Sequence, residues 1–308
     1  MKNKILITGS NGFLGRALKE HLRKVSKDEI VEATHDEFNL TEYNDCLKAT
    51  KGVDVIIQLA GLVLSRKEQE SRSAEVLSTN LLIDINIVRA AQENSVKKII
   101  LFSSLTAYSE SISAPFKEND LWNGPVPEST YAYGTAKRVL DTLTQAYRQQ
   151  YDIDITTLIL PNLYGPGDKF SYTPPPLIPN TIKQIYGAKQ NKLDNMLGGN
   201  NGTATLELLY IDDATDAIIK AVKSNMLPPT LNIGTGTPIT IQEVYSYVAK
   251  AIGFEGEILW EPETAPKASK RYLDTTLTTE KLSWKSHHSI EDGIFETVKS
   301  FLENESKK

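Results

Sequence analysis

Residues 4–15 read KILITGSNGFLG, and this stretch decides the fold. A short apolar run at residues 4–7 leads directly into a turn with three glycines, and apolar side chains then recur at helical spacing. Strand, glycine turn and helix in this order are typical of a loop that holds the diphosphate of a dinucleotide. Gly9 permits the tight turn, Gly12 lets the backbone approach the diphosphate, and Gly15 lets the helix pack closely on the strand.

The helix after this turn offers free backbone N–H groups and a partial positive charge at its first residues, where phosphates bind well. A glycine-rich turn without a ligand is the alternative, but the flanking strand and helix favour the binding loop. The sequence therefore predicts a dinucleotide site that includes Gly9, Asn11, Gly12, Phe13, Leu14 and Gly15.

Strands and helices alternate through the N-terminal half of the chain. We expect strands at 4–7, 29–33, 54–59, 98–103 and 154–160, with helices at 13–25, 42–50, 74–93 and 130–150. Several of these strands are uninterrupted apolar runs, as expected where helices cover both faces of a sheet. The pattern predicts an α/β fold, a Rossmann-type doubly wound parallel sheet with a smaller mixed α/β C-terminal substrate lobe.

The character of the chain changes after about residue 165. We expect residues 1–165 to form the dinucleotide-binding domain, with residues 205–235 returning to it. Residues 166–204 and 236–308 then form the substrate-binding lobe. Helices are expected at 212–224 and 240–252, and Asp212-Asp213 has the composition of a helix N-cap.

Composition excludes several classes of function. The chain has 308 residues, of which 40% are hydrophobic, and its net charge is −5 without long basic runs. This charge argues against nucleic acid or an anionic membrane as a partner. The single cysteine, Cys46, can form no intrachain disulfide, and the regular fold leaves no room for a leader before residue 4, so a cytoplasmic location is expected. The spacing of the four histidines predicts no metal site.

A second motif, YGTAK at residues 133–137, places Tyr133 and Lys137 one helical turn apart on one face. An ammonium beside a phenol favours the phenolate, so the tyrosine can exchange a proton with a substrate oxygen near neutral pH. Alone this pair is a weak signal, because most such pairs are ordinary helix-surface neighbours. Ser104 closes the strand before this helix, and ligands of doubly wound sheets bind beyond that edge.

With these motifs the chain resembles the extended short-chain dehydrogenases/reductases, in the epimerase and dehydratase branch that acts on nucleotide sugars. The resemblance covers nearly the whole length. It rests on TGSNGFLG at 8–15, LAG at 59–61, Asn80, SSLTAY at 103–108, YGTAK at 133–137, PNLYGP at 161–166, YIDD at 210–213, LNIG at 231–234, and Arg271 with Asp274.

The resemblance implies a role for each of three catalytic residues. Tyr133 would be the general acid/base at the C4 oxygen of the sugar. Lys137 would lower the pKa of Tyr133 and hold the hydroxyls of the nicotinamide ribose. Ser104 would hydrogen-bond the same C4 oxygen.

The resemblance also implies how the ligands lie. Asn39 and Leu40 would flank the adenine, and the path of the ribose and phosphates would be lined by Leu59, Ala60 and Gly61. Further cofactor contacts would come from His35, Asn80, Tyr133, Lys137, Pro161 and Leu163. The substrate would meet Thr106, Asn162, Lys169 and Arg271, with Asn162 and Arg271 at its diphosphate. Asn80 and Asp213 fit a purely structural hydrogen-bonding role equally well.

Departures from the family narrow the chemistry. The closest likeness is to the GDP-L-fucose synthases, which use a Cys and a His to epimerise C3 and C5, and those positions hold Thr106 and Pro176. Family dehydratases carry Asp-Glu where this chain has Leu105 and Thr106. What remains is hydride transfer at C4, most simply reduction of a 4-keto sugar nucleotide with NAD(P)H. The alternatives are a 4-epimerase with tightly bound NAD and a non-catalytic regulator that senses a dinucleotide.

Two finer expectations concern the cofactor and the assembly. The second strand ends in EATH at 32–35, without a carboxylate at its tip to bond a ribose 2′-hydroxyl and repel a 2′-phosphate. Asn11 and His35 stand where the fucose synthases carry arginines, which favours NADP(H). In this family the long helices 74–93 and 130–150 commonly pair across a two-fold axis, so we expect a homodimer. Leu206 replaces the usual Arg before Asp212, which leaves the nucleotide base open.

Overall fold

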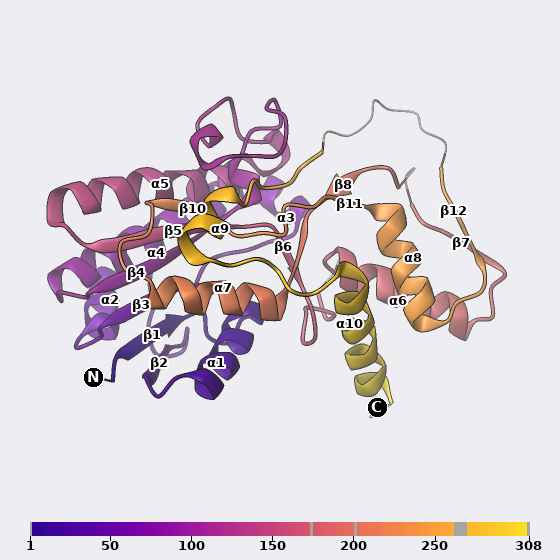
Figure 1. Ribbon diagram of the computed structural model, residues 1–308, viewed down its shortest axis with the longest axis horizontal. Helices are drawn as coiled ribbons and strands as arrows, with labels where there is room; N and C mark the ends of the chain where they lie inside the picture. Colours follow the sequence, from indigo (N-terminus) through magenta and orange to yellow (C-terminus); the bar gives the residue numbers. More distant parts are fainter. Residues whose placement is uncertain (1, 173–174, 200–201, 262–269, 307–308) are drawn as a thin grey trace.

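A six-stranded parallel sheet forms the centre of the molecule (Figure 1). The computed structural model describes residues 2–172, 175–199, 202–261 and 270–306. The strands are ordered β10-β5-β4-β3-β1-β2, and all their pairings are parallel. Their bounds are β1 Lys4–Thr8, β2 Glu29–Ala33, β3 Val55–Gln58, β4 Lys98–Ser104, β5 Asp154–Leu160 and β10 Thr230–Asn232. The predicted doubly wound sheet is confirmed.

Helices cover both faces of this sheet. On one face lie α1 Phe13–Val25 and α7 Ile211–Lys223, and on the other lie α2 Tyr43–Thr50, α4 Ser73–Glu93 and α5 Tyr131–Tyr151. Successive strand side chains alternate between the faces, so Ile5 and Ile7 enter the core under α1 and α7, whereas Leu6 enters the opposite core. This double burial explains the uninterrupted apolar runs.

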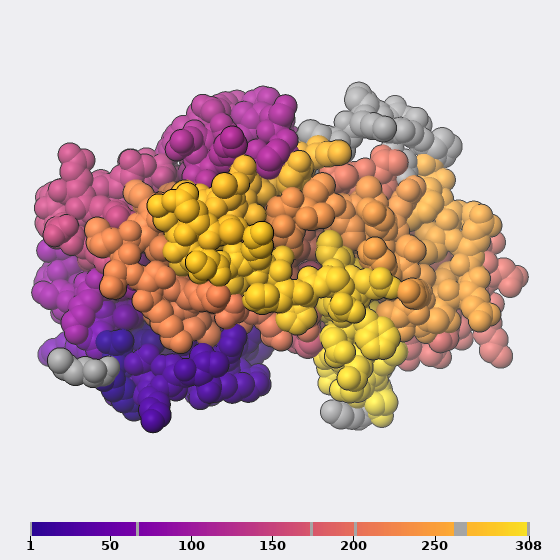
Figure 2. Space-filling view, viewed as in Figure 1, coloured from indigo at the N-terminus to yellow at the C-terminus, as the bar shows by residue number. Residues whose placement is uncertain are grey.

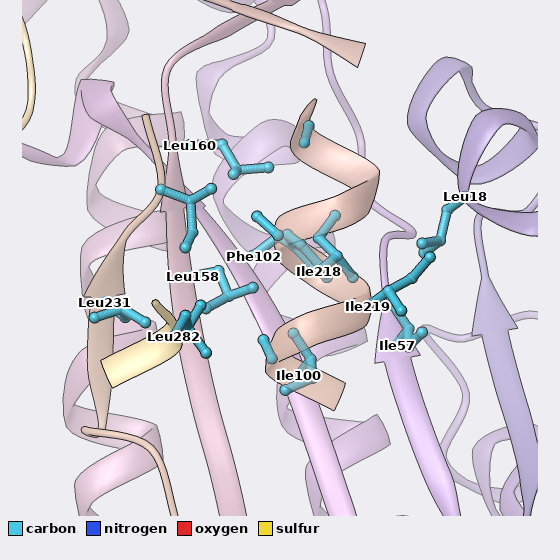
Figure 3. Close-up of a cluster of buried hydrophobic side chains, with 14 of the residues drawn as sticks. Leu18, Ile57, Ile100, Phe102, Leu158, Leu160, Ile218, Ile219, Leu231 and Leu282 are labelled. Atoms are coloured by element: carbon cyan, nitrogen blue, oxygen red, sulfur yellow. The ribbon is translucent and has the colours of Figure 1, made fainter. Parts of the chain in front are cut away.

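Figure 3 shows the core beneath α7. Ile218 and Ile219 of the helix project onto Ile57, Ile100 and other strand side chains, all of them nearly or fully buried. Burying one such side chain contributes about 1.5–3 kcal/mol, so this layer firmly fixes the carboxyl edge of the sheet relative to α1.

A smaller lobe lies to one side of the central sheet (Figure 1), and Figure 2 shows the same region in the space-filling view. Its core joins α6 Leu177–Gln190, α8 Ile241–Ile252 and α10 Ile290–Glu305. Short strand pairs complete it: β6 Asn162–Tyr164 with β9 Leu208–Tyr210, β8 Thr205–Leu206 with β11 Ile239–Thr240, and β7 Asn195–Leu197 with β12 Glu257–Leu259. The C-terminal segment serves both parts, because α9 Thr276–Leu282 packs beside β10 and α7, whereas α10 packs against α8.

Some local structure differs from the sequence expectation. Helix α7 begins at Ile211 with Tyr210 as its N-cap, so Asp212 and Asp213 lie in the first turn rather than at the cap. Short helices that the periodicity did not indicate also appear: α3 Arg66–Ser71, η1 Leu105–Ala107, η2 Glu118–Asp120 and η3 Glu128–Thr130. Within the described ranges, no helix combines the length and the apolarity that a bilayer crossing requires.

Candidate active site

The glycine turn connects β1 to α1 at the carboxyl edge of the sheet. Gly9 has a φ of +61°, and a Cβ placed there would lie 2.8 Å from the backbone nitrogen of Ala60. A Cβ on Gly15 would lie 2.3 Å from the carbonyl oxygen of Gly9. Only glycine fits either position, because backbone atoms, not flexible side chains, fill the space. Gly12 is the N-cap of α1, and its N–H donates to Gly9 O at 2.9 Å.

Beside this turn lies a cavity of about 320 Å³. The glycine turn, the tip of β2, the residues after β3 and one face of α4 form its walls. Of the residues predicted to bind the cofactor, the cavity brings together Gly9, Asn11, Gly12, His35, Asn39, Leu40, Ala60 and Gly61. An open glycine cradle at a helix N-terminus with a mainly apolar chamber beside it fits a dinucleotide's diphosphate and adenine.

The cavity wall also contains residues that the sequence did not indicate. They are Ser10, Ala33, Thr34, Phe38, Thr41, Leu62, Thr79 and Ile83. Thr79 and Ile83 sit one helical turn apart on α4, next to Asn80, so the helical period around Asn80 was a usable signal.

The cavity wall carries no carboxylate. His35 is the one ionisable side chain among the described residues that line it. Glu32 precedes the tip of β2, but its side chain turns towards α1, where Oε2 lies 2.7 Å from Lys19 Nζ and Oε1 lies 3.3 Å from Arg23 Nη2. Glu32 is not among the residues that line the cavity, and its carboxylate is paired with the cations of α1.

Asn80 holds the loop that borders the cavity. Its Nδ2 donates to Leu62 O at 3.0 Å and to Val76 O at 2.7 Å, and its Oδ1 accepts from Leu62 N at 3.1 Å. A Cβ on Gly61 would lie 2.7 Å from the same Oδ1, so the glycine allows this close approach. These hydrogen bonds give Asn80 the structural role considered above. A direct contact between Asn80 and the cofactor stays a prediction.

Other predicted cofactor residues lie around the cavity rather than in its wall. Phe13 and Leu14 begin α1 and pack against the core of the smaller lobe. Leu59 packs against the core beneath α7, and its N–H donates to Thr8 Oγ1 at 3.0 Å. Pro161 is buried after β5, and Leu163 in β6 contacts both cores. These positions support the walls of the site.

The predicted catalytic residues meet where β4 ends beside α5. Ser104 is the last residue of β4, and its Oγ accepts from Thr106 N at 3.3 Å. Ser103 Oγ donates to the carbonyl oxygen of Lys137 at 2.8 Å. A Cβ on Gly134 would lie 2.7 Å from Thr106 O, so η1 packs directly on the helix turn that carries Tyr133. Thr106 Oγ1 is buried without a partner among the described residues.

Tyr133 is partly buried and Lys137 is buried, and burial and neighbouring charges shift the pKa of both side chains. Burial raises the pKa of the Tyr133 phenol above its usual value, although the Lys137 ammonium pulls it down. Burial alone would lower the pKa of Lys137, but Asp84 and Tyr133 raise it above its usual value. The lysine therefore lowers the pKa of the phenol, as the sequence indicates, while burial and Asp84 act in the opposite direction.

The predicted substrate residues lie on the lobe side of this edge. Asn162 is exposed in β6, and the Lys169 ammonium stands 4.7 Å from the centre of the Tyr172 ring. Arg271 reaches the loop after β4, where Nη2 donates to Leu105 O at 3.2 Å and Nη1 lies 3.5 Å from Glu110 Oε1. Arg271 thus contacts the residues that follow Ser104. Asn162 and Lys169 lie on the segment that runs from β5 into the smaller lobe.

The class of protein that this fold and site define is the short-chain dehydrogenases/reductases, enzymes that use a nicotinamide dinucleotide. Within it, the chain belongs to the NAD-dependent epimerase/dehydratase family, whose sequence profile matches residues 5–234. The family resemblance, the enzyme class and the dinucleotide cofactor expected from the sequence are confirmed.

Similar proteins span the whole chain. The probable GDP-L-fucose synthase 1 of Oryza sativa subsp. japonica is 28% identical over 304 residues, which cover 98% of this chain and 92% of the relative. The GDP-L-fucose synthase of Escherichia coli K12 is 27% identical over 317 residues, covering 99% and 98%. A GDP-mannoheptose C4 reductase from Campylobacter jejuni, solved with NADP bound, shares the fold with a TM-score of 0.89 at 24% identity, covering 98% of both chains.

Proposed function

We propose that the protein reduces the C4 ketone of a nucleotide-activated sugar with NAD(P)H. The observation that carries this proposal is the Tyr133–Lys137 pair on α5, which lies beside Ser104 at the carboxyl edge of the sheet. A protonated phenol is the form that a ketone reduction consumes. Thr106 and Pro176 supply no second acid/base pair, so epimerisation at C3 and C5 is not expected of this chain.

The residues divide the work of the reduction. A bound NAD(P)H would supply the hydride to C4. Tyr133 donates its phenolic proton to the C4 oxygen, so the ketone becomes a secondary alcohol and the tyrosine a phenolate. Lys137 stabilises this phenolate through its positive charge, and the Ser104 hydroxyl donates a hydrogen bond to the developing alkoxide. The proton is then restored from solvent.

A substrate panel tests the reaction. Both curated relatives described above are named for GDP-linked sugars, which supports starting with GDP-linked 4-keto sugars, followed by UDP- and dTDP-linked ones. We expect NADPH to be consumed in equal amount to a sugar nucleotide reduced at C4, identified by mass spectrometry and NMR. If the protein binds NADPH but turns over no member of the panel, the regulator alternative replaces this proposal.

A 4-epimerase uses the same three catalytic residues, so it is the second candidate. Such an enzyme would retain NAD through purification and interconvert two sugar nucleotides without net consumption of cofactor. Finding no NAD in the purified protein would favour the reductase.

For the cofactor we propose a preference for NADPH. The carboxylate-free wall around His35 leaves room for a 2′-phosphate and offers it an imidazole. Replacing His35 with aspartate is expected to weaken NADPH binding about tenfold or more and to strengthen NADH binding, because a carboxylate bonds the 2′-hydroxyl and repels the phosphate. The quenching of cofactor fluorescence on binding measures both dissociation constants.

The control for this substitution is His21→Asn. His21 lies outside the cavity, with Nδ1 at 2.8 Å from Thr215 Oγ1 between α1 and α7. We expect its replacement to leave the ratio of the two dissociation constants unchanged. An equal affinity for NADPH in the His35→Asp variant and the unmodified chain would contradict the proposed preference.

We further propose that residues 166–204 and 236–308 hold the sugar nucleotide, with Asn162 and Arg271 at its diphosphate. Arg271 offers a planar guanidinium beside the catalytic edge, where Glu110 is its exposed carboxylate partner. An incoming diphosphate can replace that exposed carboxylate. Thr106 offers a buried hydroxyl that a sugar oxygen can pair with.

For the assembly we propose a cytoplasmic homodimer built on α4 and α5. The two helices pack together, and their outer faces carry small or apolar exposed side chains: Ala74, Ser78, Leu82, Thr142 and Ala146. Leu82 is 47% exposed, which favours burial against a second copy. We expect Leu82→Arg to convert the dimer into a monomer in light scattering at micromolar concentration. A monomeric mass for the unmodified chain would refute the dimer.

A further inference from the structure

A buried carboxylate that no motif indicated pairs with Lys137. Asp84 lies in the middle of α4, and its Oδ2 is 3.3 Å from the Nζ of Lys137. The two side chains are 3% and 9% exposed. Removing two charges from water is costly, so a buried ion pair is a poor device for stability alone. Its position beside Tyr133 suggests that the charge itself has a use.

The second oxygen of Asp84 is held from the glycine turn. Gln58 Nε2 donates to Asp84 Oδ1 at 3.0 Å and to Ala60 O at 3.0 Å. Gln58 Oε1 in turn accepts the hydroxyl of Thr8, the residue before Gly9. Thr8 and Gln58 are each at most 2% exposed. The carboxylate is therefore held from two sides in one orientation towards Lys137.

We propose that Asp84 is a positioning residue that keeps Lys137 charged and in place and thereby sets the pH at which the Tyr133–Lys137 pair loses its first proton. This inference rests on the proton-donor role proposed for Tyr133. Asp84 acts through its ion pair with Lys137 and through its charge on the Tyr133 phenol.

Few charged side chains of the described residues lie near the Tyr133–Lys137 pair. Lys137 and Asp84 act on the Tyr133 phenol, from the same helix and from α4. Arg138 is next on α5 but donates to Ala107 O at 2.7 Å and to Gly124 O at 2.8 Å. On the other elements that pack on α5, Glu128 of η3 is exposed, and Lys98 of β4 pairs with Asp154 of β5 where those strands begin.

The direction of the effect follows from the charge. Asp84 is an anion, and an anion raises the pKa of every nearby proton site, since it favours the more positive form. Removing it lowers the pKa of both Tyr133 and Lys137. The two sites interact, so the first proton lost belongs to the pair as a whole. Reduction needs the doubly protonated pair, and the alkaline limb of the activity therefore moves to lower pH.

The decisive variant is Asp84→Asn, which keeps the shape and an oxygen acceptor for Gln58 but removes the charge. Protein labelled with ¹³C at the tyrosine Cζ is titrated by NMR with NADPH bound, and Tyr133→Phe identifies the Tyr133 resonance. We expect its midpoint to fall by about one pH unit in the variant, typical for a close charge. Asp84→Glu, which keeps the charge, is expected to stay close to the unmodified midpoint.

Asp141→Asn is the matched control, another buried aspartate, one turn beyond Lys137 on α5. Its Oδ1 accepts from Thr230 Oγ1 at 2.6 Å and its Oδ2 from Trp122 Nε1 at 2.8 Å. We expect this variant to lose stability but to keep the Tyr133 midpoint. Should Asp84→Asn not fold, judged by circular dichroism, Asp84→Ser is the second neutral variant and is expected to show the same downward shift.

The outcomes separate this inference from the proposed reaction. An unchanged or raised Tyr133 midpoint in both neutral variants overturns it, whatever the activity. The titration needs no sugar, so a lowered midpoint supports the inference even if no sugar of the panel is reduced. Where a substrate is found, the alkaline limb of kcat is expected to move by the same amount. At a pH above the midpoints of both enzymes, the variant is then about tenfold slower than the unmodified chain.

Discussion

Replacing Tyr133 with phenylalanine is expected to lower kcat for ketone reduction about a thousandfold while leaving NADPH affinity within about twofold of the unmodified chain. General acid catalysis by a positioned side chain contributes about a hundred- to ten-thousandfold. The ring of phenylalanine fills the same space, and the Tyr133 phenol makes no hydrogen bond to a described residue, so only the proton donor is lost. Cofactor binding and single-turnover rates measure the two effects separately.

Tyr108→Phe is the matched control for this loss. Tyr108 follows η1 and is fully buried, and its hydroxyl donates to Asn232 Oδ1 at 2.8 Å. Losing that bond costs about 1 kcal/mol of the free energy of unfolding, yet we expect turnover to persist. Near-normal reduction by the Tyr133→Phe variant would refute the assigned proton transfer, and a new donor would then have to be sought near Ser104.

The pH dependence of the unmodified enzyme follows from the same residue. Burial holds the pKa of Tyr133 above its usual value in the cofactor-free chain. As the donor must be protonated, reduction is expected to proceed through neutral pH and to be lost only as pH rises through that pKa. The reverse oxidation of the C4 alcohol needs the phenolate and is expected to accelerate over the same range.

The sequence predicted correctly those features that depend on a local backbone requirement or on the spacing of residues within one helix. The glycines at 9 and 15 are required by contacts within the turn or to the neighbouring Ala60, and the strand bounds follow from residues buried on both faces. A prediction of this kind needs only the chain near each motif and the general geometry of parallel sheets.

What the sequence did not indicate depends on contacts between distant segments. Asp84 reads as one polar residue on an amphipathic helix, and only the packing of α4 on α5 brings it to Lys137. The raised pKa of Tyr133 has the same origin, because burial and the Asp84 charge both come from tertiary packing. Phe38 and Ile83 were missed in the cavity wall since ordinary core residues have the same composition and spacing.

Gly15→Ala is expected to weaken NADPH binding by about ten- to a hundredfold and to lower the free energy of unfolding by about 1–3 kcal/mol, the usual cost of overpacking. The new Cβ would lie 2.3 Å from Gly9 O and 2.8 Å from Ser10 Cα, so α1 must move away from the turn. Such a movement withdraws the helix N-terminus from the diphosphate it should hold.

Gly187→Ala separates this effect from the general influence of a helix alanine. Gly187 lies within α6, and a Cβ there meets nothing within 4 Å. Alanine at this open helical position should stabilise the chain by about 0.5–1 kcal/mol and leave the NADPH dissociation constant unchanged. A Gly15→Ala variant that is destabilised but binds NADPH normally would mean that the close packing of α1 serves the fold alone. Loss of affinity in that variant only would tie this packing to the diphosphate site.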